Sequence, residues 1–194
     1  MPTTPGLILA STSVYRRELL GRLRLPFTVE RPQVDEGPLP GELPLPRAQR
    51  LALAKAFAVS ELAPGSVVIG ADQVATCDGR ILDKPGGAAA AREQLAAQSG
   101  RAVQFFSAVA VVHAGPGFSD RFVDLTTVIF RTLNATEIEA YIASREWRGK
   151  AGGYAIQGLA GAFVQRIVGS YTNVVGLPLI RLAASLRSCG YALP

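Results

Sequence analysis

Residues 67–85 read VVIGADQVATCDGRILDKP, and this stretch carries the clearest strand and turn signals of the chain. The β-branched and small residues from Val67 to Thr76 predict a buried strand, and Asp78-Gly79 is a strong signal for a tight hairpin turn. Asp72 interrupts the apolar pattern with a carboxylate. Burying a carboxylate is costly unless it is paired, binds a metal or lies at a cleft. Asp72 is therefore the first candidate for a functional residue.

Strand and helix patterns alternate on both sides of this hairpin. Five prolines between residues 32 and 46 predict a loop, and Asn134 with Glu137 resembles a capping box that opens a helix. Alternating strands and helices with hairpins between them indicate an α/β protein with a mixed sheet. The other strands are expected within 3–10 and at 27–31, 103–112, 122–130 (after a Gly115-Pro116-Gly117 turn) and 163–168, and the helices at about 14–23, 47–62 and 88–97, from 134, and from 179 to a stop at Gly190.

The 194-residue chain is long enough to bury a core without disulfides or metals. Hydrophobic residues make up 48% of it and charged residues 18%, which is typical of a folded rather than a disordered chain. We expect a single domain, residues 1–194, with two tightly joined lobes. No apolar run approaches the ~20 residues of a membrane span, and the first apolar stretch is too short for a signal sequence. We therefore expect a cytoplasmic protein that does not bind membranes.

The residues able to bind metals, and the charge of the chain, exclude several classes of function. Cys77 and Cys189 are too few for a disulfide framework or a thiolate metal site. The single histidine, His113, excludes a His-rich zinc site and disfavours a Ser-His-Asp triad. The net charge of +5 is compatible with a polyanionic ligand. Nucleic acid is the weaker candidate, because the basic residues do not form runs interleaved with aromatic residues.

Residues 11–17, Ser-Thr-Ser-Val-Tyr-Arg-Arg, are a candidate phosphate site. A strand that enters a helix through small hydroxyl residues presents free backbone N–H groups, which attract anions. Arg16 and Arg17 in the first helical turn oppose the helix dipole, but a bound phosphate reverses that effect because guanidinium groups bind phosphate oxygens. The alternative is a capped helix with solvated arginines, and the local sequence favours neither.

Lys84 follows the hairpin turn and returns close to Asp72. An ideal two-residue hairpin places Lys84 opposite Gln73, on the face away from Asp72. We therefore expect Lys84 to lie near the site without an ion pair to Asp72. A solvated lysine at the strand end is the alternative.

Asp35 and Glu36 open the proline-rich loop. Their carboxylates are suitable ligands for Mg²⁺ if the loop folds over a cleft, and otherwise they are ordinary solvated acids. Lys55 lies on a helix that is otherwise Ala, Leu and Phe. Taken locally, it is an isolated cation more typical of a side chain that extends to solvent than of a catalytic group.

Residues 152–161, GGYAIQGLAG, are rich in glycine. This density indicates either a backbone that approaches a ligand or a sharply turning structural loop. The segment is not a Walker loop, since no Lys-Ser/Thr follows. Gln157 is its only side chain able to read a base edge through amide hydrogen bonds.

Four separated motifs occur in the order found in the Maf family of nucleoside triphosphate pyrophosphatases, and the chain resembles that family over residues 7–187. The resemblance implies an elongated mixed sheet flanked by helices, with two lobes around a central cleft, as in Maf and ITPase-like proteins. It is also compatible with a homodimer, since members of the family often form dimers. The motifs are Leu9-Ala10-Ser11-Thr12-Ser13 with Arg16-Arg17, Val34-Asp35-Glu36, Gly70-Ala71-Asp72-Gln73 with Asp83-Lys84-Pro85, and the stretch from Gly158 to Gly176-Leu177-Pro178.

The resemblance implies hydrolysis of the α–β phosphoanhydride of a nucleotide, giving a monophosphate and pyrophosphate with Mg²⁺ or another divalent cation. Such an enzyme is a house-cleaning hydrolase of nucleotide metabolism. Positive groups around the triphosphate neutralise charge that grows in the transition state. By this analogy the catalytic residues are Asp72 as general base with Lys55 and Lys84, the substrate-binding residues are Ser11, Tyr15, Arg16, Arg17, Gln73 and Gln157, and the metal-binding residue is Glu36.

The preferred base depends on three positions. The family branch acting on dTTP and UTP carries Arg, Thr and Gln where this chain has Tyr15, Gln73 and Gln157. The branch acting on 7-methyl-GTP carries an aromatic residue, Gln and Glu there. Tyr15 and Gln73 resemble the second branch, and an aromatic ring attracts the cationic ring of 7-methylguanine. Gln157 resembles the first branch, so 7-methyl-GTP is narrowly favoured over dTTP/UTP.

Two alternatives belong to other classes of function. A non-catalytic nucleotide-binding regulator of cell division would bind nucleotide without turnover. A nucleic-acid binder would bind long oligonucleotides with a steep salt dependence. The combination of Asp72, Glu36 and Lys84 favours catalysis over binding alone.

Overall fold

The computed structural model describes residues 4–113, 115 and 117–193. The chain folds into two compact units, each assembled from separate stretches of sequence. The first unit contains the described residues of 1–73, 107–124 and 176–194, and the second contains 74–106 and 125–175. Part of the first expected strand and Pro116 of the expected turn lie outside the described residues.

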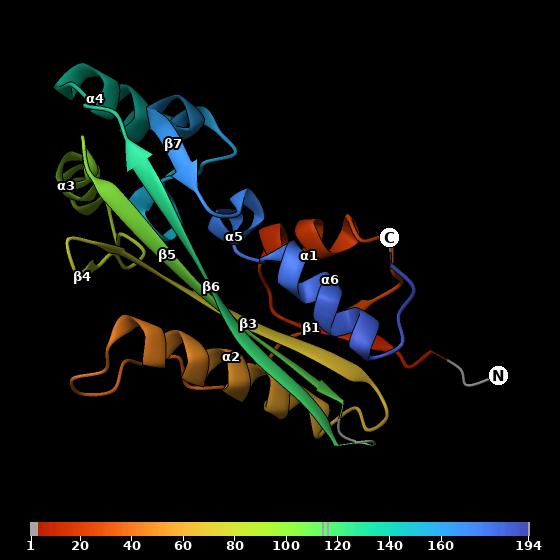
Figure 1. Cartoon of the computed structure of the whole chain (residues 1–194). Helices are drawn as coiled ribbons and strands as arrows, with labels where there is room; N and C mark the ends of the chain where they lie inside the picture. Colours follow the sequence, from red (N-terminus) through yellow and green to blue (C-terminus); the bar gives the residue numbers. More distant parts are fainter. Residues whose placement is uncertain (1–3, 114, 116, 194) are drawn as a thin grey trace. The chain divides into compact units, whose positions relative to one another are not determined.

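Seven strands form one mixed sheet, in the order β2-β1-β3-β5-β6-β7, with β4 paired to β3. β1 pairs in parallel with both β2 and β3, whereas β4 pairs antiparallel with β3 and β7 antiparallel with β6. Helices lie beside the strands of this sheet (Figure 1). The prediction of an α/β fold with a mixed sheet is therefore confirmed. The strands are β1 (Leu7–Ala10), β2 (Thr28–Glu30), β3 (Val67–Cys77), β4 (Arg80–Ile81), β5 (Ala102–His113), β6 (Phe118–Phe130) and β7 (Val164–Val168).

In the first unit, the buried strand β1 leads into α1 (Val14–Gly21). Ser13 caps this helix, since its hydroxyl accepts a bond from the Arg16 backbone N–H. Leu19 and Leu20 are buried, whereas Val14 is exposed. The end of the chain adds α6 (Leu179–Ser188), which stops before Gly190 as predicted.

Helix α2 (Pro44–Ser60) begins three residues earlier than the sequence predicts. Pro44 and Pro46 lie in its first turn, where a missing backbone N–H has no intrahelical partner to lose. The prolines therefore open the helix instead of extending the loop before it. Figure 1 shows α2 running along β3.

In the second unit, the predicted hairpin is present. Asp78 and Gly79 both have positive φ, 49° and 75°, as a two-residue turn between antiparallel strands requires. The ladder pairs Thr76 with Ile81 and Cys77 with Arg80. β4 ends at Ile81, so Lys84 belongs to the segment after the strand and not to the strand itself.

The remainder of the second unit packs around aromatic residues. Tyr154 lies edge-on to Phe130, with ring centroids 4.8 Å apart. The predicted capping box is complete, because the Asn134 side chain accepts from Glu137 N and the Glu137 side chain accepts from Asn134 N. The sequence did not reveal α5, whose five residues are too few for a periodic pattern. The helical elements are α3 (Ala88–Gln98), α4 (Ala135–Ser144), α5 (Tyr171–Val175) and the short 3₁₀ turns η1 (Ala151–Gly153) and η2 (Leu159–Phe163).

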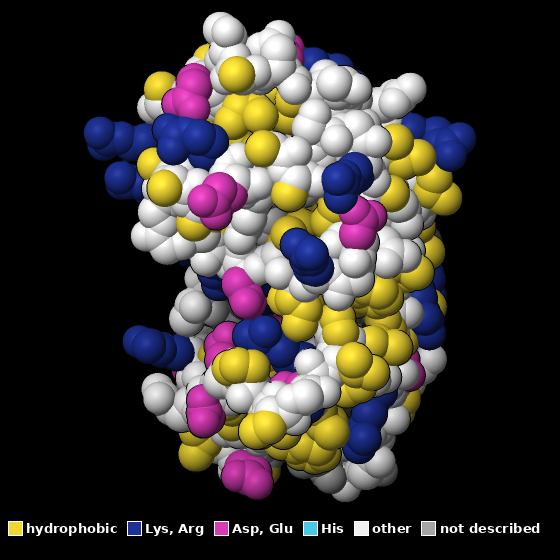
Figure 2. All heavy atoms as spheres, turned by 90° about the vertical axis from the view of Figure 1, so that its left-hand side faces the viewer, with side chains coloured by type: hydrophobic (Ala, Val, Ile, Leu, Met, Phe, Trp, Pro, Cys, Tyr) yellow, Lys and Arg dark blue, Asp and Glu magenta, His cyan; other side chains and the backbone are white. Residues whose placement is uncertain are grey.

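On one face of the molecule, charged side chains are dispersed (Figure 2). On the face drawn in Figure 2, basic and acidic groups alternate among hydrophobic patches and do not form a continuous basic band. None of the helices in the described part of the chain is long and apolar enough to cross a bilayer.

Candidate active site

The centre of the site is an ion pair in the first unit. Lys55 Nζ on α2 donates a 2.7 Å hydrogen bond to Asp72 Oδ1 on β3. The exposed fractions of the two side chains are 5% and 11%. The cost of burying Asp72 is therefore offset by a direct cationic partner. The local interpretation of Lys55 as an isolated cation reaching solvent is wrong.

A glycine brings these two side chains together. A Cβ at Gly70 would lie 2.2 Å from the Ala52 carbonyl oxygen and 2.5 Å from the Ala56 nitrogen. Only the absence of a side chain lets the α2 backbone approach β3 this closely. Lys55 lies between these two alanines in the sequence, and this contact places it opposite the strand that carries Asp72.

The loop after β2 supplies a second carboxylate. Glu36 Oε1 lies 3.2 Å from Lys55 Nζ, with 58% of the Glu36 side chain exposed. Lys55 therefore links a buried carboxylate to an exposed one. The neighbouring Asp35 instead accepts the Gly37 backbone N–H at 2.8 Å, which shapes the loop.

An ion pair between Glu42 and Arg50 on α2 holds the far end of this loop. Arg50 donates two hydrogen bonds to Glu42, of 2.6 and 2.7 Å, and one of 3.0 Å to the Gly37 carbonyl. Its guanidinium lowers the pKa of Glu42 from 4.5 to about 2. The loop that carries Glu36 is thus held to the same helix that carries Lys55.

Arg16 brings a second cation to the cluster. Its Nη1 lies 3.4 Å from the hydroxyl of the buried Ser11, and its Nε donates a 3.0 Å hydrogen bond to the Gly176 carbonyl. Burial lowers the pKa of Arg16, while the carboxylates of Asp72 and Glu36 oppose that shift. The Arg16 guanidinium is therefore within electrostatic reach of both acids.

The structure accordingly joins five predicted site residues in one unit: Ser11, Arg16, Glu36, Lys55 and Asp72. Three more of the predicted residues belong to the same unit. Gln73 follows Asp72 and donates from Nε2 to the buried Ser107 hydroxyl at 3.0 Å. Tyr15 and Arg17 flank Arg16 on α1, and Arg17 is exposed.

Lys84 and Gln157 belong to the second unit. Both residues are exposed. The Lys84 segment is supported just upstream, because Gln94 Nε2 donates to the Asp83 carbonyl at 3.0 Å. The turn after Gln157 is held by Glu146, whose Oε2 accepts the Leu159 backbone N–H at 2.9 Å.

A family model described as Maf-like protein matches residues 6–189. The chain belongs to the Maf-like family. A 7-methyl-GTP pyrophosphatase of Bordetella pertussis is 50% identical over 188 residues, which cover 96% of this chain and 93% of that protein. A 7-methyl-GTP pyrophosphatase of Xanthomonas campestris is 50% identical over 192 residues, 98% of this chain and 99% of that protein. A dTTP/UTP pyrophosphatase of Sphingopyxis alaskensis is 48% identical over 190 residues, 97% and 99% of the two chains.

The donor set of this Maf-like chain fits a divalent cation bound together with substrate. Among the residues that the structure describes, no three His, Cys, Asp or Glu side chains gather to hold a metal by themselves. Mg²⁺ commonly takes one or two carboxylates and completes its shell with substrate phosphates and water. Glu36 is the suitable carboxylate, since 58% of its side chain is exposed.

Sequence reasoning missed two contacts in this Maf-like site. Ser107 lies in an apolar strand and carries no local signal, but it is fully buried and holds Gln73. Gly176 was part of a family motif, yet its contact with Arg16 joins positions 160 residues apart. A periodicity analysis cannot detect such pairs, because both depend on tertiary packing.

Proposed function

We propose that the chain is a nucleoside triphosphate pyrophosphatase that hydrolyses the α–β phosphoanhydride, with 7-methyl-GTP as preferred substrate. The observation that carries the proposal is the Asp72 carboxylate, buried on β3 beside the Lys55 ammonium and within electrostatic reach of Arg16. A carboxylate base beside the Lys55 ammonium, with the Arg16 guanidinium interacting with it electrostatically, suits water attack on a polyphosphate.

In the proposed reaction Asp72 accepts a proton from water as the water oxygen bonds to the α-phosphorus. The bridging oxygen of the α–β bond leaves with the pyrophosphate, and the other product is the nucleoside monophosphate. Arg16 and Lys55 stabilise the negative charge on the phosphate oxygens, because both are fixed in a site of reduced dielectric. Ser11 orients Arg16 through its hydroxyl.

The charges of the cluster support a role for a divalent cation. Arg16 and Lys55 contribute two positive charges, and Glu36 and Asp72 two negative ones, so the cluster is neutral by itself. These four groups alone therefore do not compensate the charge of a triphosphate. Mg²⁺ held by Glu36 would neutralise and polarise the phosphate oxygens.

The Lys55 ammonium would then exchange partners. A phosphate oxygen competes with Glu36 more easily than with Asp72, because the Glu36 contact is longer and more exposed. Release from Lys55 frees the Glu36 carboxylate for the cation. Asp72 keeps its partner and stays in place as the base.

The preference for 7-methyl-GTP is supported by Tyr15 and Gln73 and by the names of the relatives at 50% identity. The second candidate is a dTTP/UTP pyrophosphatase. Gln157 favours it, as does the 48% identity to a relative with that name. Lys84, as a further phosphate-binding cation, and Gln157, as a base contact, enter the proposal through the family resemblance alone.

Pyrophosphate release from 7-methyl-GTP, dTTP, UTP, CTP, GTP and ATP, with Mg²⁺ present, tests the proposal. We expect the fastest turnover with 7-methyl-GTP, and a loss of roughly 10²- to 10⁴-fold in Asp72→Asn. Tyr15→Arg combined with Gln73→Thr should move the preference toward pyrimidines. Tight nucleotide binding without turnover by the wild type would instead identify a regulator. Gel filtration of the same preparation tests for a homodimer.

A further inference from the structure

The Arg16 side chain is held at its base by a backbone group far away in the sequence. Arg16 Nε donates a 3.0 Å hydrogen bond to the carbonyl oxygen of Gly176. Gly176 begins the Gly176-Leu177-Pro178 motif, to which the proposed reaction gives no role. Both residues belong to the first unit.

This contact restricts how the guanidinium can be oriented. The guanidinium is planar, so fixing Nε fixes the plane in which its two terminal nitrogens lie. The Ser11 hydroxyl adds a second contact, at 3.4 Å from Nη1. With the Nε donor already satisfied, the terminal nitrogens are the donors that remain for a phosphate.

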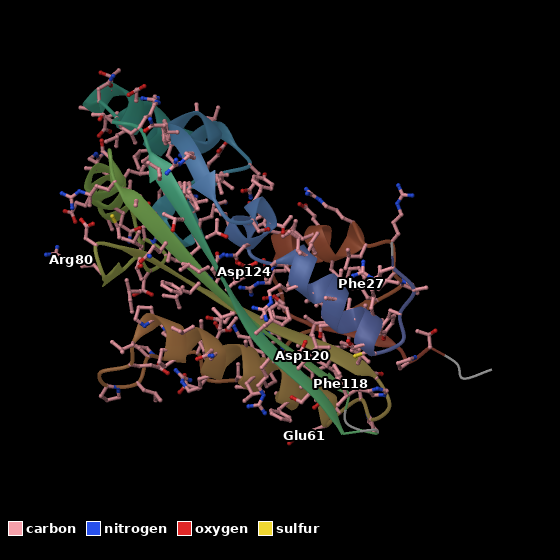
Figure 3. The ribbon with its side chains drawn as sticks, viewed as in Figure 1. Phe27, Glu61, Arg80, Phe118, Asp120 and Asp124 are labelled. Carbon is pink, nitrogen blue, oxygen red and sulfur yellow. The ribbon has the colours of Figure 1, made fainter. Side chains whose placement is uncertain are left out.

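The Gly176 carbonyl is itself firmly placed. Gly176 has a φ of +128°, a conformation that residues with a side chain rarely adopt. The next residue, Leu177, is fully buried, and α6 starts two residues later. Arg181 on α6 donates to the Val123 carbonyl of β6 at 2.9 Å. The next residue of β6, Asp124, is labelled in Figure 3. Arg181 also lies over the Phe122 ring, 4.8 Å from its centroid.

We infer that Gly176 is a positioning residue for the reaction, acting through Arg16. Its carbonyl orients the guanidinium so that the terminal nitrogens face the triphosphate near Asp72. This inference rests on the proposed function for its catalytic consequence, whereas the hydrogen bond itself can be measured without any substrate.

Gly176→Ala is the direct test, because a side chain at this φ moves the carbonyl away. The added Cβ would meet Arg16 only at 3.7 Å, so the change acts through the backbone and not through a clash. Gly190→Ala is the matched control. Gly190 also has a positive φ, of +89°, and belongs to the same unit, but nothing lies within 4 Å of its Cβ position.

We expect Gly176→Ala to lower kcat/KM roughly 10- to 100-fold, since small displacements of a positioned group have effects of this size. Gly190→Ala should match the wild type. In an Arg16→Lys background, which lacks the Nε–H donor, Gly176→Ala should change kcat/KM by no more than about twofold. If the two defects multiply instead, Gly176 does not act through Arg16 and the inference is wrong.

The Arg16 Nε–H signal in a ¹⁵N NMR spectrum is the second readout, assigned by its disappearance in Arg16→Lys. It should be protected from exchange with water in the wild type and in Gly190→Ala, and unprotected in Gly176→Ala. An unchanged signal in Gly176→Ala overturns the inference. If the wild type hydrolyses no nucleotide, the proposed function fails by itself. Binding of inorganic tripolyphosphate with Mg²⁺, weakened in Gly176→Ala but not in Gly190→Ala, would still support the positioning role, and equal binding would exclude it.

Discussion

Lys55 Nζ lies 2.7 Å from Asp72 Oδ1 and 3.2 Å from Glu36 Oε1, so that one ammonium group serves two carboxylates of different burial. The Asp72 side chain is mostly buried, with 11% exposed, whereas 58% of the Glu36 side chain is exposed. The first contact therefore contributes to the folded state, and the second is available for exchange with ligands.

Lys55→Met should destabilise the protein by about 3 kcal/mol at pH 7, because it leaves the Asp72 carboxylate buried without its cation. Urea unfolding of the wild type and the variant measures this difference. Lys55→Met combined with Asp72→Asn should recover most of the loss, since the second change removes the unpaired charge. A double variant as unstable as the single one would show that lost packing, and not lost pairing, is responsible.

Gly70→Ala should be strongly destabilising, by about 3 kcal/mol, because its Cβ would overlap the Ala52 carbonyl oxygen. It should also reduce hydrolysis, since pushing α2 off β3 separates Lys55 from Asp72. The matched control is Gly21→Ala on α1, where nothing lies within 4 Å of the new Cβ. That change should be neutral or should stabilise by up to about 1 kcal/mol. Thermal unfolding of both variants checks the opposite signs.

Glu36→Gln should raise the Mg²⁺ concentration needed for half-maximal hydrolysis by roughly tenfold, a loss typical of a weakened metal site. Asp35→Asn is the control, because an amide oxygen can still accept the Gly37 N–H. The variant should keep the Mg²⁺ dependence of the wild type. Titration of both variants with Mg²⁺ at saturating nucleotide measures the difference. Equal shifts in the two would remove Glu36 from the metal site.

Glu42→Gln should make unfolding less sensitive to acid. Arg50 lowers the pKa of Glu42 in the folded state from 4.5 to about 2. A lowered folded-state pKa contributes stability that is present above the unfolded value and is lost as the pH falls through the folded one. The stability difference between wild type and variant should therefore be constant above about pH 5 and shrink toward pH 2. Unfolding curves collected between pH 2 and pH 7 measure this stability difference. A difference that stays constant down to pH 2 would contradict the prediction.

The sequence predicted the turns and helix starts that depend only on neighbouring residues. Asp78-Gly79 turned the hairpin because both residues tolerate positive φ, and Asn134 with Glu137 opened α4 because each caps the other's backbone. The predicted start of α2 was wrong because the rule used for prolines has an exception. Prolines normally end a helix, but Pro44 and Pro46 occupy the first turn of α2, where they are tolerated.

In the candidate site, likewise, the residues with a local signal were predicted and their distant partners were not. Asp72 stood out because a carboxylate in an apolar strand needs a partner, and the structure provides one. The identity of that partner was not readable from the local sequence, because Lys55 meets Asp72 only through the close approach at Gly70. Contacts of Ser107 and Gly176 were equally hidden, since each joins residues brought together by the complete sheet and α6.

The interleaved composition of the two units has a practical consequence for protein engineering. The chain passes from one unit to the other after Gln73, Phe106, Asp124 and Val175. No single truncation isolates either unit: a cut after residue 106, for example, removes part of both. A fragment that ends at such a break therefore lacks segments of both units, whereas circular permutation retains every segment and is the suitable way to relocate the termini of this scaffold.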